Sequence, residues 1–465
     1  MLVLKQKNDW SKLLKLGVIV LGGLFALISV YASLYVIHGG IIPQRDFSAF
    51  LANDIWIFLG FVLINMLFGT YIFYNKSLID LLYLTILSQL VFSVLLMVLS
   101  YVSDGTMISR IVVFLNFVVG TIILFVFNSL MFKLYRQLRG QKRIMVVGQE
   151  QRVLEAVKNF ELMKNRRHLV SHVVLNNYYQ NVREYSHEVD IVYATGHIEE
   201  TERLKIYEYL MQNNKKLFIS TSFENLMMVN PNIMNFEDES IIEVSSFEIP
   251  AEEDMVKRLF DLVVSLFLTI ITLPIMVITA IVIKLDSPGP ILYKQERVTK
   301  NHKHFNILKF RSMTQTAEDQ TGPVLATSND DRVTKVGKFI RATRIDELPQ
   351  LFNVLVGDMS LVGPRPERPF FVEQFKEQNP YYSLRHHVRA GITGYAQVYG
   401  KYSTDFNNKL NFDLLYIKNY SLAFDFKLLF QTIKILFDKV SSRGLDDVSD
   451  QTFSWKDFDH VTVIR

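Results

Sequence analysis

The sequence KRLFDLVVSLFLTIITLPIMVITAIVIKLD, residues 257–286, is an apolar segment that decides how the second half of the chain meets the membrane. It begins with Lys257 and Arg258, has Pro274 near its centre, and is followed by further basic residues from Lys284 onward. The apolar run is long enough to cross a hydrocarbon core, which needs about 20 helical residues. Because cytoplasmic segments carry the excess of Lys and Arg, both flanks favour the same side. We therefore predict a re-entrant membrane helix, a helix–break–helix that bends at Pro274.

The alternative is a kinked helix that crosses the membrane completely. It would place a strongly basic stretch outside the cell, with Lys294, Arg297, Lys300, Lys303, Lys309 and Arg311. Non-helical backbone at membrane depth needs hydrogen-bond partners. We expect the hydroxyls of Thr269 and Thr272 to bond the carbonyls freed by the proline.

Four further apolar runs precede this segment, at residues 13–37, 50–74, 78–102 and 108–134. Lysines precede the first run, and a basic cluster follows the fourth, so both ends of the group favour the cytoplasm. We predict a four-helix transmembrane domain over residues 1–140. Charged residues lie only near the ends of the runs, which argues against a channel or transporter.

Residues 141–250 have an ordinary composition in which strand-like and helical segments alternate. This alternation predicts a Rossmann-like, doubly wound α/β domain. A dinucleotide site would need the G-x-G-x-x-G fingerprint, and only Gly148 follows the first strand. We therefore expect no nucleotide site in this domain.

The chain of 465 residues contains no cysteine, which excludes disulfides, zinc–thiolate sites, iron–sulfur clusters and thiol catalysis. Its net charge of +4 is a mild bias, and we expect no nucleic-acid partner.

The chemistry-bearing residues lie between residues 286 and 400. Helical spacing predicts a short helix over residues 333–343. Pro349 favours the first turn of a second helix, which Gly357 ends. Asp346 and Glu347 then precede a helix N-terminus, where free N–H groups favour carboxylate or phosphate. Taken alone, such a pair is usually a helix cap.

Arginines around this pair change the interpretation. Arg341, Arg344 and Arg365 carry planar donors that match phosphate oxygens. The adjacent carboxylates Asp346 and Glu347 suit a hard cation such as Mg²⁺, and an aspartate is also a competent covalent phosphate acceptor. Next to a membrane segment, this set suits a diphosphate that meets a lipid phosphate.

Five ordered motifs give the catalytic half a family resemblance. They are KRLFD (257–261), KFRSM (309–313), DELPQLFN (346–353), GDMSLVGPRP (357–366) and RAGITGYAQ (389–397). The stretch resembles bacterial enzymes that load a sugar-1-phosphate onto undecaprenyl phosphate, and the first half resembles the long capsule and exopolysaccharide type. The family pattern often has Ser-Pro at the helix bend, where this chain has Leu273-Pro274.

The resemblance implies that Asp346 attacks a UDP-sugar, releases UMP and forms a phosphosugar-aspartate that undecaprenyl phosphate then attacks. Glu347 and Mg²⁺ would assist, with Asp346 and Glu347 as the metal ligands. It also implies roles for residues matched to family motifs: phosphate contacts by Arg341, Arg365, Lys309 and Arg311, and nucleotide-side contacts by Arg389, Thr393 and Gln397. His386 and His387 we interpret as structural.

The predicted organisation is a transmembrane domain (1–140), a Rossmann-like cytoplasmic domain (141–250), a mainly helical catalytic domain with the re-entrant helix (251–440) and a loosely held polar tail (441–465). Resemblance places the chain in the bacterial inner membrane, with the catalytic domain in the cytoplasm. We expect the part after residue 252 to suffice for catalysis. A homo-oligomer is compatible with the sequence.

Glucose is the sugar we predict, with galactose as the alternative. A membrane scaffold for polysaccharide assembly is a competing hypothesis. A nucleotide-sensing regulator is a third, disfavoured by the missing glycine fingerprint. The intact Asp346–Glu347 pair and Arg365 favour the enzyme over the scaffold.

Overall fold

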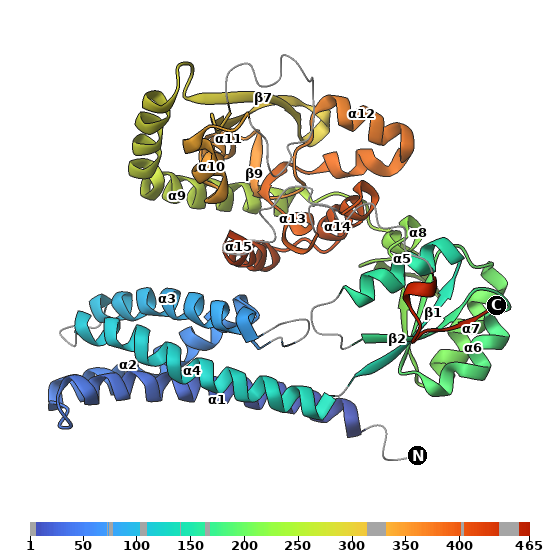
Figure 1. Ribbon diagram of the computed structural model, residues 1–465, viewed down its shortest axis with the longest axis horizontal. Coiled ribbons are helices and arrows are strands. Elements are labelled where there is room, and N and C mark those ends of the chain that lie inside the picture. The colour runs from blue at the N-terminus through green and yellow to red at the C-terminus, as the bar shows by residue number, and fades with distance from the viewer. Residues whose placement is uncertain are drawn as a thin grey trace. The chain divides into compact units, whose positions relative to one another are not determined.

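The computed structural model describes residues 6–71, 73, 78–102, 109–139, 141–162, 168–313, 332–400, 404–436 and 455–465. The chain divides into two compact units, Met1–Ile219 with Phe453–Arg465, and Ser220–Thr452. Figure 1 shows the elements of both.

The first unit begins with four long helices, α1 (Gln6–Ile37), α2 (Gln44–Leu67), α3 (Leu78–Val102) and α4 (Arg110–Arg139). Together with α9 (Ala251–Asp286), they make five helices long and apolar enough to cross a membrane. These helices identify the chain as a membrane protein and confirm the predicted N-terminal runs. Polar pairs also join the helices inside the bundle, since Ser29 Oγ donates to Asn116 Oδ1 at 2.9 Å.

A parallel sheet follows in the order β11-β2-β1-β3-β4. Its strands are β1 (Lys142–Gly148), β2 (His168–Val174), β3 (Ile191–Thr195), β4 (Lys216–Ile219) and β11 (Thr462–Ile464). Helix α5 (Glu150–Glu161) packs on one face through Val153 and Val157, which join one buried cluster. Helices α6 (Tyr178–Tyr185) and α7 (Glu200–Gln212) supply the other cluster. The sheet is therefore covered on both faces, as the alternation of strands and helices predicts.

The C-terminal end differs from the predicted loose tail. Strand β11 pairs in parallel with β2, and Leu175 N donates to the Ile464 carbonyl at 3.0 Å. Just before it, the turn η5 (Trp455–Asp457) leads to Phe458 and Val461, which are buried against the α5 face. The expectation is thus wrong for residues 455–465, because β11 covers the otherwise open edge of β2. Residues 441–454 lie outside the described part of the chain.

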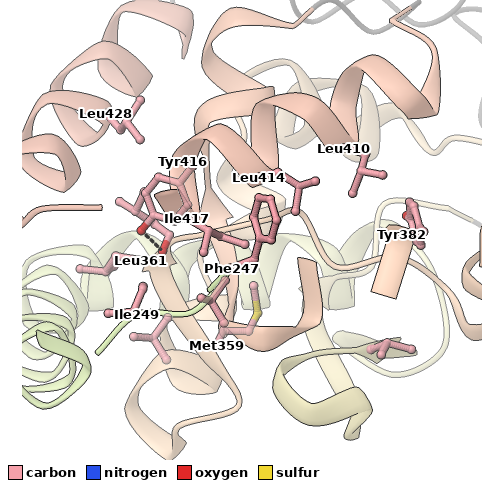
Figure 2. Packing of buried hydrophobic residues seen from close by; sticks show 14 of the residues in the cluster. Phe247, Ile249, Met359, Leu361, Tyr382, Leu410, Leu414, Tyr416, Ile417 and Leu428 are labelled. Carbon is pink, nitrogen blue, oxygen red and sulfur yellow. Dashed lines mark hydrogen bonds between the residues drawn. The ribbon is translucent and has the colours of Figure 1, made fainter. Parts of the chain in front are cut away.

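The boundary of the α/β domain also falls earlier than residue 250. Helix α8 (Phe223–Met227) and the hairpin of β5 (Asn232–Phe236) and β6 (Glu239–Glu243) belong to the second unit. Leu226, Phe247 and Ile249 are buried in the main core of that unit, which Figure 2 shows. The α/β domain therefore ends with β4 at Ile219.

The second unit is mainly helical around this core. After α9 come the antiparallel strands β7 (Leu292–Val298) and β8 (His304–Phe310), then α10 (Lys335–Ala342) and α11 (Gln350–Val356). Parallel strands β9 (Met359–Val362) and β10 (Ala390–Thr393) lie beside each other, separated in sequence by α12 (Pro369–Gln378). The last helices are α13 (Tyr395–Tyr399), α14 (Phe406–Lys418) and α15 (Leu422–Leu436). In Figure 2, Tyr416 of α14 lies near Leu361 of β9, and Leu414 of the same helix belongs to the same core.

Helix α9 is one continuous helix with Pro274 inside it, rather than two helices separated by a break. Its ribbon turns through a sharp bend in Figure 1. Proline removes the hydrogen bond to the residue four positions earlier and so bends a helix. The hydroxyls of Thr269 and Thr272 do not bond a carbonyl freed by the proline, contrary to our expectation. They donate instead to the carbonyls of Ser265 and Leu268.

Both arms of α9 pack against other elements of the second unit, to which the helix itself belongs. In the first arm, Lys257 is buried in an ion pair with Asp425 of α15. In the second arm, Met276 and Ile283 pack with Phe310 in a separate apolar cluster. The bent helix therefore begins and ends on the same folded unit.

Candidate active site

A tight turn between α10 and α11 carries the predicted carboxylate pair. Arg344 has the left-handed backbone conformation, with φ of 58°, and the turn η3 (Ile345–Glu347) follows it directly. Pro349 immediately precedes α11, and Gly357 ends that helix with φ of 102°. The predicted second helix and its two terminal signals are confirmed.

The two neighbouring carboxylates have different surroundings. Glu347 Oε1 lies 3.2 Å from Lys309 Nζ and 3.6 Å from Arg365 Nη2. Arg344 Nη1 is 3.8 Å from the same oxygen. Asp346 is 8% exposed, and its Oδ1 has no hydrogen-bond partner among the described residues. The N–H groups of the following helix N-terminus, which we expected to favour a carboxylate, do not bond this oxygen.

These surroundings move the two pKa values apart. Burial, followed by the negative charge of Glu347, raises the pKa of Asp346 to about 6, although nearby cations oppose the shift. Burial also opposes ionisation of Glu347, but Lys309, Arg365 and Arg344 outweigh it and lower its pKa to about 2. At neutral pH Glu347 is therefore a fixed anion within its cations, and Asp346 is a mostly ionised carboxylate held near its titration point.

Arg341, the last basic residue of α10, lowers the pKa of Asp346 through its positive charge. Lys309 of β8 and Arg365 also lie at the pair, so the structure brings together three of the four predicted phosphate-binding residues. Arg311 does not join them. Its guanidinium donates to the carbonyls of Ser287 at 2.7 Å and Pro288 at 2.8 Å, just after α9.

Buried Arg385 and half-buried Arg297, which the sequence did not indicate, hold the backbone around Arg365. Arg385 donates from Nη2 to the Arg365 carbonyl at 2.8 Å and pairs with Asp413, also at 2.8 Å. Arg297 donates to the Pro366 carbonyl at 3.0 Å. Neither residue carries a signal beyond its charge, because the carbonyls of Arg365 and Pro366 that they bind come from a distant segment.

The glycines of two motifs allow this loop to pack closely. A Cβ on Gly363 would lie 2.3 Å from the Arg389 carbonyl oxygen, and one on Gly391 would lie 2.1 Å from Gly363 N. Such contacts exclude any side chain at either position. The motifs GDMSLVGPRP and RAGITGYAQ are thus two sides of one backbone junction that carries Arg365.

The residues predicted for a nucleotide side have other partners. Arg389 Nη2 donates to Asp254 Oδ1 at 2.6 Å, at the start of α9. Buried Thr393 shares a hydrogen bond of 2.6 Å with Thr432, and Gln397 donates to the Ile392 carbonyl. None of these contacts involves the carboxylate pair.

Among the described residues, neither of the two adjacent histidines contacts the carboxylate pair. Burial and the charge of Arg385 lower the pKa of His386 to about 2, so this ring is neutral. His387 Nδ1 lies 3.5 Å from Glu248 Oε1.

The carboxylate pair offers a hard cation only a partial ligand set. Within the described residues, no group of three or more His, Asp or Glu side chains is placed to hold a metal ion. The partnerless Oδ1 of Asp346 is an available oxygen ligand, whereas Glu347 is already paired with cations. Such a site fits Mg²⁺ that takes most of its ligands from water and substrate phosphates.

Known proteins match the part of the chain that contains this site. The family described as bacterial sugar transferase matches residues 252–439. A putative undecaprenyl-phosphate N-acetylgalactosaminyl 1-phosphate transferase of Bacillus subtilis is 48% identical over 149 residues, which cover 31% of this chain and 83% of that protein. The chain belongs to the bacterial sugar transferase family.

Longer relatives match over the same half. A UDP-N-acetylgalactosamine-undecaprenyl-phosphate N-acetylgalactosaminephosphotransferase of Aeromonas hydrophila is 48% identical, over 40% of this chain and 45% of that protein. A UDP-glucose:undecaprenyl-phosphate glucose-1-phosphate transferase of Escherichia coli is 42% identical, over 38% of this chain and 39% of that protein. The chain thus spans less than half the length of these two relatives.

Proposed function

We propose that the chain transfers a sugar-1-phosphate from a UDP-sugar to undecaprenyl phosphate and so starts the synthesis of an exopolysaccharide. The observation that carries the proposal is the contrast within the Asp346–Glu347 pair. Glu347 is neutralised by Lys309 and Arg365, whereas Asp346 Oδ1 is buried without a partner. A carboxylate in that state is suited to nucleophilic attack.

In the first step, an oxygen of Asp346 forms a bond to the phosphorus that carries the sugar. The bond from that phosphorus to the bridging oxygen breaks, and UMP leaves with this oxygen. In the second step, a phosphate oxygen of undecaprenyl phosphate attacks the same phosphorus and releases the Asp346 carboxylate. Lys309, Arg341 and Arg365 are the cations that would hold the phosphate oxygens in both steps.

Mg²⁺ bound to the Asp346 and Glu347 oxygens would offset the negative charge of the diphosphate. The residues of the chain meanwhile fix the geometry: Arg385 and Arg297 hold the loop of Arg365, and Lys309 orients Glu347. The proposed site does not include Arg311, Thr393 or Gln397, because their hydrogen bonds go to other parts of the chain.

The proposal places α9 in the inner membrane as a re-entrant helix, with the catalytic unit on the cytoplasmic side. Support comes from the bend at Pro274 and from the contacts of both arms with the same unit. This arrangement would bring the carboxylate pair near the membrane surface that holds the lipid acceptor.

Glucose remains the donor sugar that we propose, with galactose as the alternative. The relatives named above include enzymes for glucose and for N-acetylgalactosamine, so the donor panel must contain UDP-N-acetylgalactosamine as well.

The decisive experiment measures UMP release by the purified full-length chain with undecaprenyl phosphate and each UDP-sugar in turn. Without the lipid acceptor, intact-mass analysis should find a sugar-phosphate adduct on the peptide that contains Asp346. UMP release with no adduct would indicate direct transfer. No release with any donor would favour a scaffold for polysaccharide assembly.

A further inference from the structure

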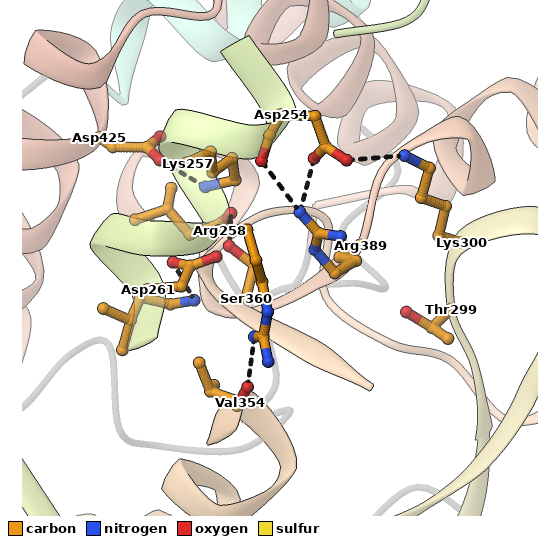
Figure 3. Close-up of polar contacts among 12 residues, drawn as sticks. Asp254, Lys257, Arg258, Asp261, Thr299, Lys300, Val354, Ser360, Arg389 and Asp425 are labelled. Carbon is orange, nitrogen blue, oxygen red and sulfur yellow. Dashed lines mark hydrogen bonds and ion pairs between the residues drawn. The ribbon is translucent and has the colours of Figure 1, made fainter. Parts of the chain in front are cut away.

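An open cavity of about 680 Å³ lies at the start of α9, outside the site described above. Its wall includes the cations Arg258, Lys300 and Arg389 and the carboxylates Glu248 and Asp254. Figure 3 shows Arg389 and Lys300 meeting at Asp254, with Arg258 beside them on α9.

The cations outnumber the anions that neutralise them. Asp254 forms ion pairs with both Lys300, at 3.1 Å, and Arg389, at 2.6 Å. Arg258 donates to two uncharged acceptors, the Val354 and Leu355 carbonyls at 2.6 and 2.9 Å. Among the described residues, no carboxylate lies within ion-pair distance of Arg258.

Other features agree with an unbalanced positive charge. Burial, followed by the charge of Arg389, lowers the pKa of Arg258, although the negative charges of Asp261 and Asp254 oppose the shift. Arg389 Nε is buried without a hydrogen-bond partner among the described residues. Glu248, the other carboxylate of the wall, lies 3.5 Å from His387, which is not one of the three cations of the cavity.

The same wall becomes apolar along α9. Asp254 and Arg258 occupy its first turns, and Met255, Leu259 and Leu262 continue the same helical face. Met255 is 71% exposed and Leu259 is 64% exposed. From Asp254 to Leu262 the face extends about 12 Å, at 1.5 Å per residue. A ligand that matches it has an anionic head and an apolar chain.

We propose that this cavity binds the phosphate group of an anionic membrane phospholipid. Arg258, Lys300 and Arg389 would hold the phosphate, and an acyl chain would lie along Met255, Leu259 and Leu262. Basic pockets on the cytoplasmic side of membrane helices are suited to such headgroups. The bound lipid would balance the positive charge and fix the depth at which α9 enters the bilayer.

This site is separate from the carboxylate pair. Arg258 binds the carbonyls at the C-terminal end of α11, whereas Asp346 precedes the N-terminal end of that helix. The length of α11 is about 10 Å at 1.5 Å per residue. The inference depends on the membrane insertion of α9 and not on the transfer reaction.

The test uses the full-length chain in nanodiscs that contain equal amounts of phosphatidylglycerol and phosphatidylcholine. Native mass spectrometry counts the lipid retained on the released protein. Lys300→Gln removes one cation from the cavity, and Lys303→Gln is the matched control, because Lys303 is 68% exposed and pairs with Asp358 instead. We expect the wild type to retain phosphatidylglycerol preferentially.

Lys300→Gln should reduce that retention about fivefold, the equivalent of roughly 1 kcal/mol for one basic residue near an anionic surface. Lys303→Gln should leave it unchanged, and so should Asp346→Asn, which separates this site from catalysis. Equal retention by Lys300→Gln and Lys303→Gln would overturn the proposal. So would displacement of the lipid by undecaprenyl phosphate or by a UDP-sugar, which would make the cavity a substrate site.

Discussion

Lys309 Nζ lies 3.2 Å from Glu347 Oε1 and joins β8 to the turn between α10 and α11. This contact leaves the neighbouring Asp346 as the carboxylate without a partner on its Oδ1. A symmetrical pair would share the cations, and neither carboxylate would then be an available nucleophile. The asymmetry leads to distinct expectations for the two residues.

Replacing Asp346 by Asn should abolish UMP release. The amide keeps the size of the side chain but has no nucleophilic oxygen anion, and loss of a nucleophile costs roughly 10⁶-fold in rate. The rate of UMP release, measured at saturating donor, gives the result. Glu373→Gln is the control, since this exposed carboxylate pairs with Lys376 of the same helix and with no other cation in the described part of the chain. An Asp346→Asn protein with wild-type activity would remove this residue from the mechanism.

The pH dependence of kcat/KM should report the ionisation of Asp346. Its pKa is raised to about 6, so the nucleophilic form is present above that pH and is lost as the pH falls through it. We expect activity to decrease up to tenfold per pH unit below about 6. A profile that stays flat down to pH 4.5 would contradict the raised pKa.

Glu347→Gln should shift this profile as well as reduce the rate. The negative charge of Glu347 helps to raise the pKa of Asp346, so a neutral amide should move the acid limb to lower pH. Lys309 would then lose its ion-pair partner, and we expect it to turn toward Asp346 and weaken the nucleophile. The same rate measurements at several pH values test both effects. A lower rate with an unmoved acid limb would mean that Glu347 acts only through substrate or metal.

The two short helices of the site could be predicted from the sequence, because the residues that begin and end them lie within or next to each helix. Pro349 and Gly357 bound α11, and helical spacing predicts α10. The sequence could not predict which group each charged side chain binds. Arg311 and Arg365 both occur in the family motifs, yet one binds the carbonyls after α9 and the other faces Glu347. Which of them meets a carboxylate depends on packing between segments far apart in sequence.

The same limit applies to the fold. Strands β1 to β4 are apolar runs between turn signals, and the sequence predicts them. Strand β11 has only Thr462–Ile464, and its partner β2 ends at Val174. A strand this short has no periodicity to detect, so its pairing depends on an edge that another part of the chain leaves open.

The membrane path of α9 can be tested with cysteines, since the chain has none of its own. We predict that Asp286→Cys is labelled by a membrane-impermeant maleimide only after the cells are permeabilised. Asp286 is preferable to Ser287, whose hydroxyl accepts a hydrogen bond from Arg311. Ile41→Cys is the control for external labelling, because Ile41 is 84% exposed between α1 and α2. Labelling of Asp286→Cys in intact cells would show that α9 crosses the membrane completely.

The last prediction concerns the smallest catalytic fragment. The sequence suggested a start near residue 252, but the second unit begins at Ser220. Leu226, Phe247 and Ile249 are buried in its core, and loss of each large apolar side chain costs about 2–5 kcal/mol. Lys418 would also lose acceptors, since its Nζ donates to the Ser245 carbonyl at 2.6 Å. A buried cation without acceptors destabilises further.

We therefore expect a fragment of residues 220–452 in detergent micelles to fold and release UMP, and a fragment of residues 252–452 to unfold at a much lower temperature. Thermal unfolding and the UMP assay on both fragments give the comparison. Equal stability would mean that residues 220–251 only rest on the core. A folded but inactive 220–452 fragment would assign a catalytic contribution to the first unit, because every residue of the proposed site lies within the fragment.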